Sequence, residues 1–444
     1  MNRSKITPKN ISHKINNFNK LSDENAYQID RSPDSTRTEI DTIKLTIINQ
    51  FFPPDYAATG QLIEELADQL KNSFHSVEVF SSQPSYAFKR NDLPCWEHHQ
   101  DISIRRSRAN AGYGRIRGKA LTGVLFTLRT LLHLIKHPSS RQLVLLTTAP
   151  PFLPLIGYVL SHFCKISYVC LLYDIYPDIA IELGVIEKEY WLTRLWHHFN
   201  RLTWKRAAAI IVLNSTMKDN IAKKCPMVAD KIAIIPNWSD PVEIAPIAKQ
   251  DNWFAHEHGL VDRFTVMYSG NMGRCHDLET LLNAISILRD TPIQFVFIGS
   301  GDKRNYLENN IQALELKNCL FLPYQTKENL PFSLAAGDLS IVSIDRRMEG
   351  LVAPSKLYSA LAVAAPIAAI CPAHSYLNQL FTEAKCGATF LNGDSEGLAK
   401  YIYELSQNPQ LAKELGRSGR EYCIENYTGS KVAQDYLKLF KTLV

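Results

Sequence analysis

The residues best suited to do chemistry stand in turns of the second half of the chain, each between an expected strand and an expected helix. Ser355 and Lys356 precede an apolar run, where they would place a hydroxyl and an ammonium group at the positive end of a helix. In the turn 269–274, Gly270 lets the backbone approach a ligand, Asn271 is polar, and Arg274 could bind a diphosphate. Both turns favour a site for a diphosphate. The alternatives are a helix cap with a solvated lysine, and a tight turn with an exposed arginine.

A third turn, at 298–304, contains two further glycines, Gly299 and Gly301. Its pattern is G-x-G-x-x-R, so the third glycine of the dinucleotide fingerprint is replaced by Arg304. The next expected strand, 319–322, is followed by Pro323 and Tyr324 and not by an acidic residue that could bind a ribose. The turn therefore suits a nucleotide contact but not an NAD or NADP site, and no Walker A pattern occurs in the chain.

Short apolar strands that alternate with helical patterns are expected to position these turns. The expected strands are 44–50, 76–81, 143–147, 166–172, 209–213 and 231–235 in the first half, and 264–269, 293–298, 319–322, 339–344 and 366–370 in the second. Such β-α-β repeats predict two α/β, doubly wound, Rossmann-like domains with parallel sheets, which bind ligands at the carboxyl ends of their strands. We expect a polar, disordered tail over 1–43, one domain over 44–240, a linker near 236–241, and a second domain over 241–429. The amphipathic helix 430–444 is expected to cross back to the first domain.

Composition excludes several classes of protein. The 444 residues are 45% hydrophobic and 21% charged, with a net charge of +5, as in ordinary globular domains and unlike disordered or nucleic-acid-binding chains. The nine cysteines are scattered without a C-x-x-C pair, so neither a zinc site nor a thioredoxin-type pair is supported. Reduced cytosolic thiols fit this pattern, and the polar first forty residues lack the apolar segment of a secretory leader.

Two basic segments of the first half suggest contact with a membrane surface. Residues 102–141 contain nine Lys or Arg and no acidic residue, and apolar residues interleave with them. The nine are Arg105, Arg106, Arg108, Arg115, Arg117, Lys119, Arg129, Lys136 and Arg141. The segment 190–206 is basic and rich in aromatic residues. An anionic membrane surface is the expected partner, with a solvated face above a core helix as the alternative. Nucleic acid is not expected, since no recognition module accompanies the charge.

The most apolar run, 149–173, is interrupted by prolines and by His162 and Lys165. This pattern favours a helix and a strand of the core over a membrane span. The expected location is therefore peripheral, at the cytoplasmic face of the plasma membrane.

Four segments, in order along the chain, resemble a known family. They are Asn49-Gln50-Phe51-Phe52-Pro53-Pro54 with Gly60, Tyr173-Asp174-Ile175-Tyr176-Pro177-Asp178, Ile235-Pro236-Asn237-Trp238 leading to Tyr268-Ser269-Gly270-Asn271, and Val352-Ala353-Pro354-Ser355-Lys356-Leu357-Tyr358. The ordered set resembles the retaining GT-B glycosyltransferases of family 4, in the branch of colanic-acid and other exopolysaccharide transferases. It spans about 45 to 370, nearly all of the chain expected to be ordered.

The resemblance implies transfer of a sugar from a nucleotide sugar to a saccharide or polyprenyl-diphosphate-linked acceptor, with the anomeric configuration retained. It implies no cofactor besides the nucleotide-sugar co-substrate. By the same resemblance the diphosphate would contact Gly270, Asn271, Arg274, Ser355 and Lys356. The base would border Gly299 and Tyr324, and Gly60 would close over the phosphates and sugar. Asp174 would stand near the reacting centre. The residues expected to act in catalysis are Asp174, Arg274 and Lys356.

The chemistry needs no metal, because N–H groups, Arg and Lys can stabilise the leaving diphosphate. No D-x-D triplet, the usual metal-binding signature of GT-A enzymes, occurs in the chain. Asp174 as a base is a hypothesis, since the β-phosphate itself can deprotonate the acceptor in this class.

The sequence departs from the family in its E-x7-E pair of donor-binding glutamates. Leu351 and Ser359 stand at the two positions, and Glu349 lies two residues early. Glu349 and Ser359 are therefore the candidates for the donor contacts that the pair would make. A GT-B nucleotide-sugar epimerase and a non-catalytic nucleotide-sugar-binding subunit remain as alternatives.

Overall fold

The computed structural model describes residues 39–55, 57–84, 93–99, 101–107, 116–139, 141–164 and 166–444. Most of the predicted tail, 1–38, lies outside the described residues. The tail prediction is wrong for its last five residues: Glu39–Thr42 form a 3-10 turn (η2), and Ile40 and Ile43 are buried. The two isoleucines pack into the core, which gives this segment a fixed position.

The N-terminal half of the chain forms an eight-stranded sheet in the order β3-β4-β2-β1-β5-β6-β7-β8. Its strands are β1 (Lys44–Ile48), β2 (Ser76–Ser81), β3 (Trp96–His99), β4 (Ile102–Arg106), β5 (Gln142–Thr147), β6 (Ser167–Leu172), β7 (Ala209–Val212) and β8 (Ile232–Ile234). Neighbouring strands are parallel except β3, which runs antiparallel to β4 at the edge. All six predicted strands are confirmed to within about two residues, whereas β3 and β4 were not predicted.

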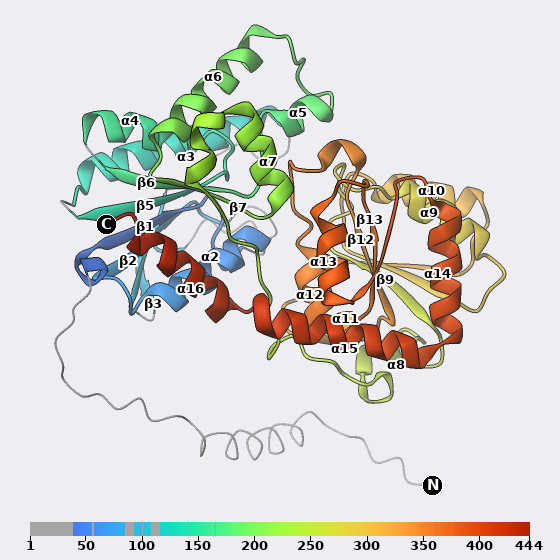
Figure 1. The fold of residues 1–444 in the computed structure, drawn as a ribbon. Coiled ribbons are helices and arrows are strands. Elements are labelled where there is room, and N and C mark those ends of the chain that lie inside the picture. The colour runs from blue at the N-terminus through green and yellow to red at the C-terminus, as the bar shows by residue number, and fades with distance from the viewer. Residues whose placement is uncertain are drawn as a thin grey trace, which may run out of the picture. The chain divides into compact units, whose positions relative to one another are not determined.

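The C-terminal half forms a six-stranded, fully parallel sheet in the order β11-β10-β9-β12-β13-β14. Its strands are β9 (Thr265–Ser269), β10 (Gln294–Ile298), β11 (Cys319–Leu322), β12 (Leu339–Ser343), β13 (Ile367–Ile370) and β14 (Gly387–Phe390). The five predicted strands are confirmed, and β14 is an additional edge strand. The two Rossmann-like sheets confirm the predicted GT-B architecture (Figure 1).

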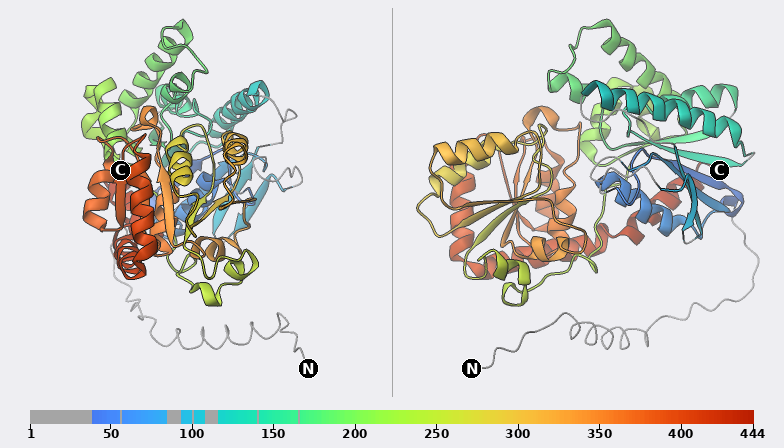
Figure 2. Two further views of the ribbon diagram at one scale, coloured as in Figure 1. Left: turned by 90° about the vertical axis from the view of Figure 1, so that its right-hand side faces the viewer. Right: turned by 180° about the vertical axis from the view of Figure 1, so that it is seen from behind.

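Helices cover the N-terminal sheet on both faces. They are α2 (Ala58–Leu70), α3 (Ile116–Lys136), α4 (Leu155–Phe163), α5 (Asp178–Glu182), α6 (Trp191–Arg206), α7 (Ser215–Lys224) and, from the end of the chain, α16 (Gly429–Lys441). Helices α3, α4 and α6 lie on one face, and α2 and α16 on the other (Figures 1 and 2). Helix α16 is held there by its buried Phe440, whose ring meets Phe74 edge to face at 6.0 Å.

The helices of the C-terminal half are α8 (Trp253–Glu257), α9 (Glu279–Ile287), α10 (Arg304–Ala313), α11 (Leu330–Ala335), α12 (Lys356–Ala362), α13 (Tyr376–Ala384), α14 (Ser395–Gln407) and α15 (Pro409–Asn426). The predicted linker at 236–241 is anchored between the halves. Trp238 is buried and its Nε1 donates to Glu65 of α2 at 2.6 Å, while the Ser239 amide donates to the Tyr427 carbonyl at 3.1 Å.

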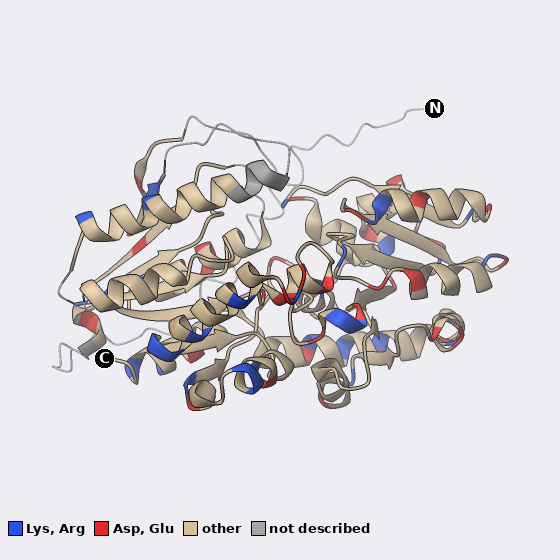
Figure 3. Cartoon of the chain, turned by 90° about the horizontal axis from the view of Figure 1, so that it is seen from above, with Lys and Arg blue, Asp and Glu red and all other residues tan. Residues whose placement is uncertain are grey.

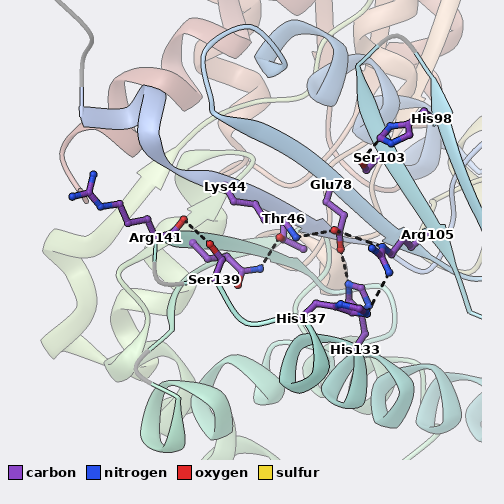
Figure 4. A network of polar contacts seen from close by, with 11 residues as sticks. Lys44, Thr46, Glu78, His98, Ser103, Arg105, His133, His137, Ser139 and Arg141 are labelled. Carbon is purple, nitrogen blue, oxygen red and sulfur yellow. Dashed lines mark hydrogen bonds and ion pairs between the residues drawn. The ribbon is translucent and has the colours of Figure 1, made fainter.

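A buried polar network ties α3 to the sheet beneath it (Figure 4). Glu78 of β2 accepts from Lys44 at 2.8 Å and contacts the His133 Nε2 of α3 at 2.5 Å. Burial raises the pKa of Glu78, but the hydrogen bonds from His133 and Lys44 outweigh it and bring the pKa to about 2. Arg105 lies 3.7 Å from the same carboxylate and 3.3 Å from His137. The inner face of α3 is therefore partly polar and held by charge.

Candidate functional site

Two glycine turns meet at the carboxyl edge of the C-terminal sheet, where ligands bind in such folds. Gly270 follows β9 with φ 118°, and Gly299 follows β10 with φ 127°, backbone conformations that favour glycine. A Cβ on Gly299 would lie 2.2 Å from the Gly270 carbonyl oxygen, so the two turns touch and no side chain fits between them. A Cβ on Gly270 would lie 3.1 Å from Lys356 Cε. The turns thus expose backbone beside an ammonium group.

Lys356 is the central cation of this edge. Its Nζ donates to the Asn271 carbonyl at 3.0 Å and lies 4.8 Å from the centroid of the Tyr268 ring. No carboxylate of the described residues lies within 4 Å of it, and burial lowers the pKa of Lys356 to about 7. An ammonium without a counter-ion, next to open glycine backbone, is suited to bind an anion.

Ser355 stands beside this lysine at the N-cap position of α12. It is exposed and makes no capping hydrogen bond, so its hydroxyl is available to a ligand. Helix α12 has only seven residues. The charge of Lys356, more than the dipole of so short a helix, makes this position attractive to a phosphate.

His276 lies close to the two turns, in the loop that follows β9. The Nδ1 of His276 donates to the Ser343 carbonyl oxygen at 2.7 Å. The backbone carbonyl of His276 in turn accepts from Lys303 Nζ. Burial and the neighbouring charge of Lys356 lower the pKa of His276 to about 3. The imidazole is therefore neutral, and the positive charge of this edge comes from lysine and arginine.

Asp174 faces this edge from the N-terminal half, in the loop after β6. Its amide lies 3.3 Å from Thr148 Oγ1, and the next amide, of Ile175, donates to the Leu351 carbonyl at 2.9 Å. This backbone bond joins the Asp174 loop to the segment that leads into Ser355 and Lys356. Burial raises the pKa of Asp174 to about 6. Burial and then the charge of Asp174 raise the pKa of the Cys275 thiol to about 11, which places Asp174 near the turn after β9.

Two further predicted residues lie on the same edge. Arg274 is exposed, and its Nη2 donates to the Leu183 carbonyl at the end of α5 in the N-terminal half. The Tyr324 ring is 51% exposed and would lie 3.2 Å from a Cβ on Gly299, with its hydroxyl 3.4 Å from the Ser300 carbonyl oxygen. Tyr324 therefore borders the glycine turns and is about half exposed.

Three residues predicted to contact the donor make other contacts in this structure. Gly60 is buried in α2, where a Cβ would lie 3.1 Å from the Phe51 carbonyl carbon, so it serves the packing of α2 on its own loop. Glu349 accepts from Thr216 Oγ1 of α7 at 2.6 Å, and its Oε2 is buried without a hydrogen-bond partner. Ser359 Oγ donates to the Lys356 carbonyl at 3.1 Å, within its own helix.

The described residues contain no group of three or more His, Cys, Asp or Glu side chains that could hold a metal ion. The arrangement that remains is a cation beside open backbone, an aromatic ring and, across from them, a carboxyl group. Such a set can hold a diphosphate and a base and can move a proton near them.

The chain is similar to known glycosyltransferases in sequence and to solved structures in fold. Residues 58–238 match the family described as glycosyl transferase 4-like domain, and residues 250–422 match glycosyl transferases group 1. The chain is similar to a probable glycosyltransferase, WbjE, of Pseudomonas aeruginosa, with 23% identity over 87% of this chain and 94% of that protein. It is also similar to a putative colanic acid biosynthesis glycosyl transferase, WcaI, of Escherichia coli, with 26% identity over 76% and 86%. Among solved structures, HepE of Anabaena in complex with UDP-glucose has a TM-score of 0.67 and 14% identity, over 90% of this chain and 100% of that one.

Proposed function

Because the chain belongs to the family 4 GT-B glycosyltransferases, we propose that it transfers a sugar from a nucleoside diphosphate donor to a hydroxyl of a lipid-linked saccharide, with retention. The observation that carries the proposal is the ammonium of Lys356 beside the turns at Gly270 and Gly299, without a carboxylate within 4 Å among the described residues. The loop of Asp174 in the other half is hydrogen-bonded to the segment before this lysine through the Ile175 amide and the Leu351 carbonyl. The name of WcaI and its role in colanic acid biosynthesis favour surface polysaccharide synthesis as the setting.

In the proposed reaction the bond between the anomeric carbon and the β-phosphate oxygen breaks, and the acceptor oxygen forms a bond to the same carbon. The nucleoside diphosphate leaves with an added negative charge. Lys356 and the Ser355 hydroxyl are placed to stabilise that charge, so the step needs no metal ion. The acceptor hydroxyl loses its proton either to the leaving β-phosphate or to Asp174. Tyr324, half-exposed beside the glycine turns, is placed to border the base.

Thermal unfolding against a panel of UDP, GDP and dTDP sugars tests the proposal. A donor at 100 times its dissociation constant adds about 2.7 kcal/mol to the free energy of unfolding, so one nucleotide of the panel should raise the melting temperature clearly. Release of free nucleotide without transfer would favour the epimerase instead. Binding without turnover would favour the non-catalytic subunit, and no shift with any nucleotide would contradict the donor site itself.

We also propose that α3, α4 and α6 dock on an anionic membrane surface, where a lipid-linked acceptor would present its head group. None of the three helices contains Asp or Glu, and the long helix α3 shows no red in the view of this layer in Figure 3. The outer face of α3 exposes five apolar side chains at helical spacing, each at least 43% exposed: Leu121, Val124, Leu128, Leu132 and Ile135. Its inner face buries His133 and Thr130. A helix that turns apolar residues outward suits an interfacial membrane contact.

Two of the predicted basic residues do not belong to this surface. Arg106 is buried and pairs with Glu97, and Arg105 contributes to the Glu78 network. Arg108 and Arg115 lie outside the described residues. The same helices carry Arg129 and Lys136 on α3 and Arg194, Arg201 and Lys205 on α6, of which Arg194 is paired with Glu189. No helix among the described residues is long and apolar enough to cross a bilayer.

Sedimentation with vesicles that contain about one third anionic lipid tests this docking. The protein should co-sediment at low salt and be released at high salt, because the Debye length shortens with ionic strength. The double variant Leu128→Ser, Leu132→Ser should partition at least about tenfold more weakly, since it removes apolar area from the contact. Ile287→Ser is the matched control, because Ile287 of α9 is 53% exposed but lies in the C-terminal half. Equal loss in both variants, or a wild type that stays in solution at low salt, would contradict the proposal.

A further inference from the structure

A pocket of about 290 Å³ lies where three loops of the C-terminal sheet meet the end of α5. One wall carries three cations, Arg274, Lys303 and Arg347, which follow β9, β10 and β12 respectively. The other wall is formed by residues 181–184 of the N-terminal half. The pocket therefore has one wall from each half of the molecule.

Hydrogen bonds to backbone carbonyls hold the three cationic side chains in place at this pocket. Arg274 Nη2 donates to the Leu183 carbonyl, and Arg347 Nη1 donates to the Glu182 carbonyl at 3.3 Å, so both bind the C-terminal end of α5. Lys303 Nζ donates to the carbonyl of His276. Carbonyl contacts use only part of the donor capacity of a guanidinium or ammonium group, so each cation keeps donors for a ligand.

The charges of the pocket are not balanced. Arg347 is paired with Asp345 at 3.2 Å. Among the residues that line the pocket, Glu182 is the acidic one, against three basic residues. Within the described part of the chain, no carboxylate lies within 4 Å of Arg274 or Lys303. A concave site with an excess of cations favours an anion. Its volume is close to the lower end of small-molecule pockets, as expected for one sugar residue or a diphosphate.

We propose that this pocket binds a phosphate or carboxylate carried by the acceptor, so that the enzyme glycosylates an acidic acceptor. The inference rests on the proposed function and adds the chemical class of the acceptor. Two observations favour the acceptor over the donor. The proposed function places the donor diphosphate at Gly270, Ser355 and Lys356, whereas Arg274, also expected at the diphosphate, binds the Leu183 carbonyl of this pocket. One wall of the pocket is the helix that begins four residues after Asp174. A bound anion would also bridge the two halves next to the reacting centre.

Calorimetric titration of the full chain tests the proposal. The protein is first saturated with the nucleoside diphosphate that the thermal panel selects, and is then titrated with inorganic pyrophosphate, D-glucuronate or neutral D-glucose. We expect one of the two anions to bind the saturated protein, while glucose does not. Pyrophosphate binding would identify a lipid diphosphate as the source of the charge, and glucuronate binding an acidic sugar.

The double variant Lys303→Gln, Arg347→Gln should weaken that anion at least tenfold and leave nucleoside diphosphate affinity within about twofold. Arg346→Gln, an exposed arginine of the same turn that does not line the pocket, should change neither. If neither anion binds, or if the double variant loses nucleotide and anion together, the pocket is not an acceptor subsite. If no nucleotide of the panel binds, the proposed function fails. The same titrations on the nucleotide-free chain, with wild type and the double variant, then show whether the pocket binds an anion.

Discussion

Replacing Lys356 by methionine is expected to lower kcat/KM about 100- to 1000-fold, the usual cost of removing one preorganised group that stabilises a leaving anion. Methionine keeps most of the aliphatic side chain, but removes the ammonium group that lies over the Tyr268 ring and beside Gly270. The loss should appear both in turnover and in affinity for the nucleoside diphosphate, because the ammonium meets the diphosphate before and after the bond breaks.

The same lysine predicts how donor affinity depends on pH. Burial lowers the pKa of Lys356 to about 7 in the donor-free chain, and a bound diphosphate favours the charged form. Affinity should therefore be level below about pH 7 and fall above it, by up to tenfold per pH unit, because binding must then be accompanied by proton uptake. Titrations between pH 6 and 9 in two buffers of different ionisation enthalpy would measure that uptake.

Two variants separate this effect from a general loss of structure. Lys356→Met should melt no lower than wild type, since it removes a desolvated ammonium that has no carboxylate partner in the described part of the chain. Lys317→Met changes an exposed lysine of the same half and should leave affinity and turnover unchanged. If Lys356→Met binds and turns over like wild type, the diphosphate lies elsewhere.

The strands were predictable wherever burial on both faces produces a continuous apolar run. The segment 209–213, Ala-Ile-Ile-Val-Leu, and the segment 293–298 are of this kind, and each forms a strand with a neighbour on both sides. The missed strands β3 and β14 are short edge strands with sequences WEHH and GATF, where polar residues or glycine remove the pattern. Strand β4 alternates as ISIRR, and its two arginines were assigned to a basic segment instead.

The site was predictable to the extent that it depends on local order along the chain. A turn that follows a strand and precedes a helix lies at the carboxyl edge of a parallel sheet, which is why Gly270, Gly299 and Lys356 come together. Contacts between the two halves were not predictable in this way. Arg274 reaches Leu183, 91 residues away, and Glu349 reaches Thr216, 133 residues away. Such contacts depend on how the halves pack, which no spacing along the sequence reports.

Asp174→Asn is expected to lower kcat about 100-fold or more and to leave donor affinity unchanged, if the carboxylate removes the acceptor proton. Burial raises the pKa of Asp174 to about 6. The quantity kcat/KM should therefore rise with pH through about 6, as the carboxylate ionises, and fall above about 7, as Lys356 loses its proton. The variant should lose the acid limb of this profile and keep the alkaline one, a result that a merely structural role of Asp174 would not produce.

Asp219→Asn provides the matched control, because Asp219 is an exposed carboxylate of α7 in the same half of the chain. It should leave both limbs of the profile and kcat unchanged. The two explanations of proton removal then make opposite predictions for Asp174→Asn. Turnover at the wild-type rate with an intact acid limb would remove Asp174 from the chemistry and assign the proton to the β-phosphate. Loss of turnover at unchanged donor affinity would assign it to the carboxylate, because only a group that acts after donor binding separates the two quantities.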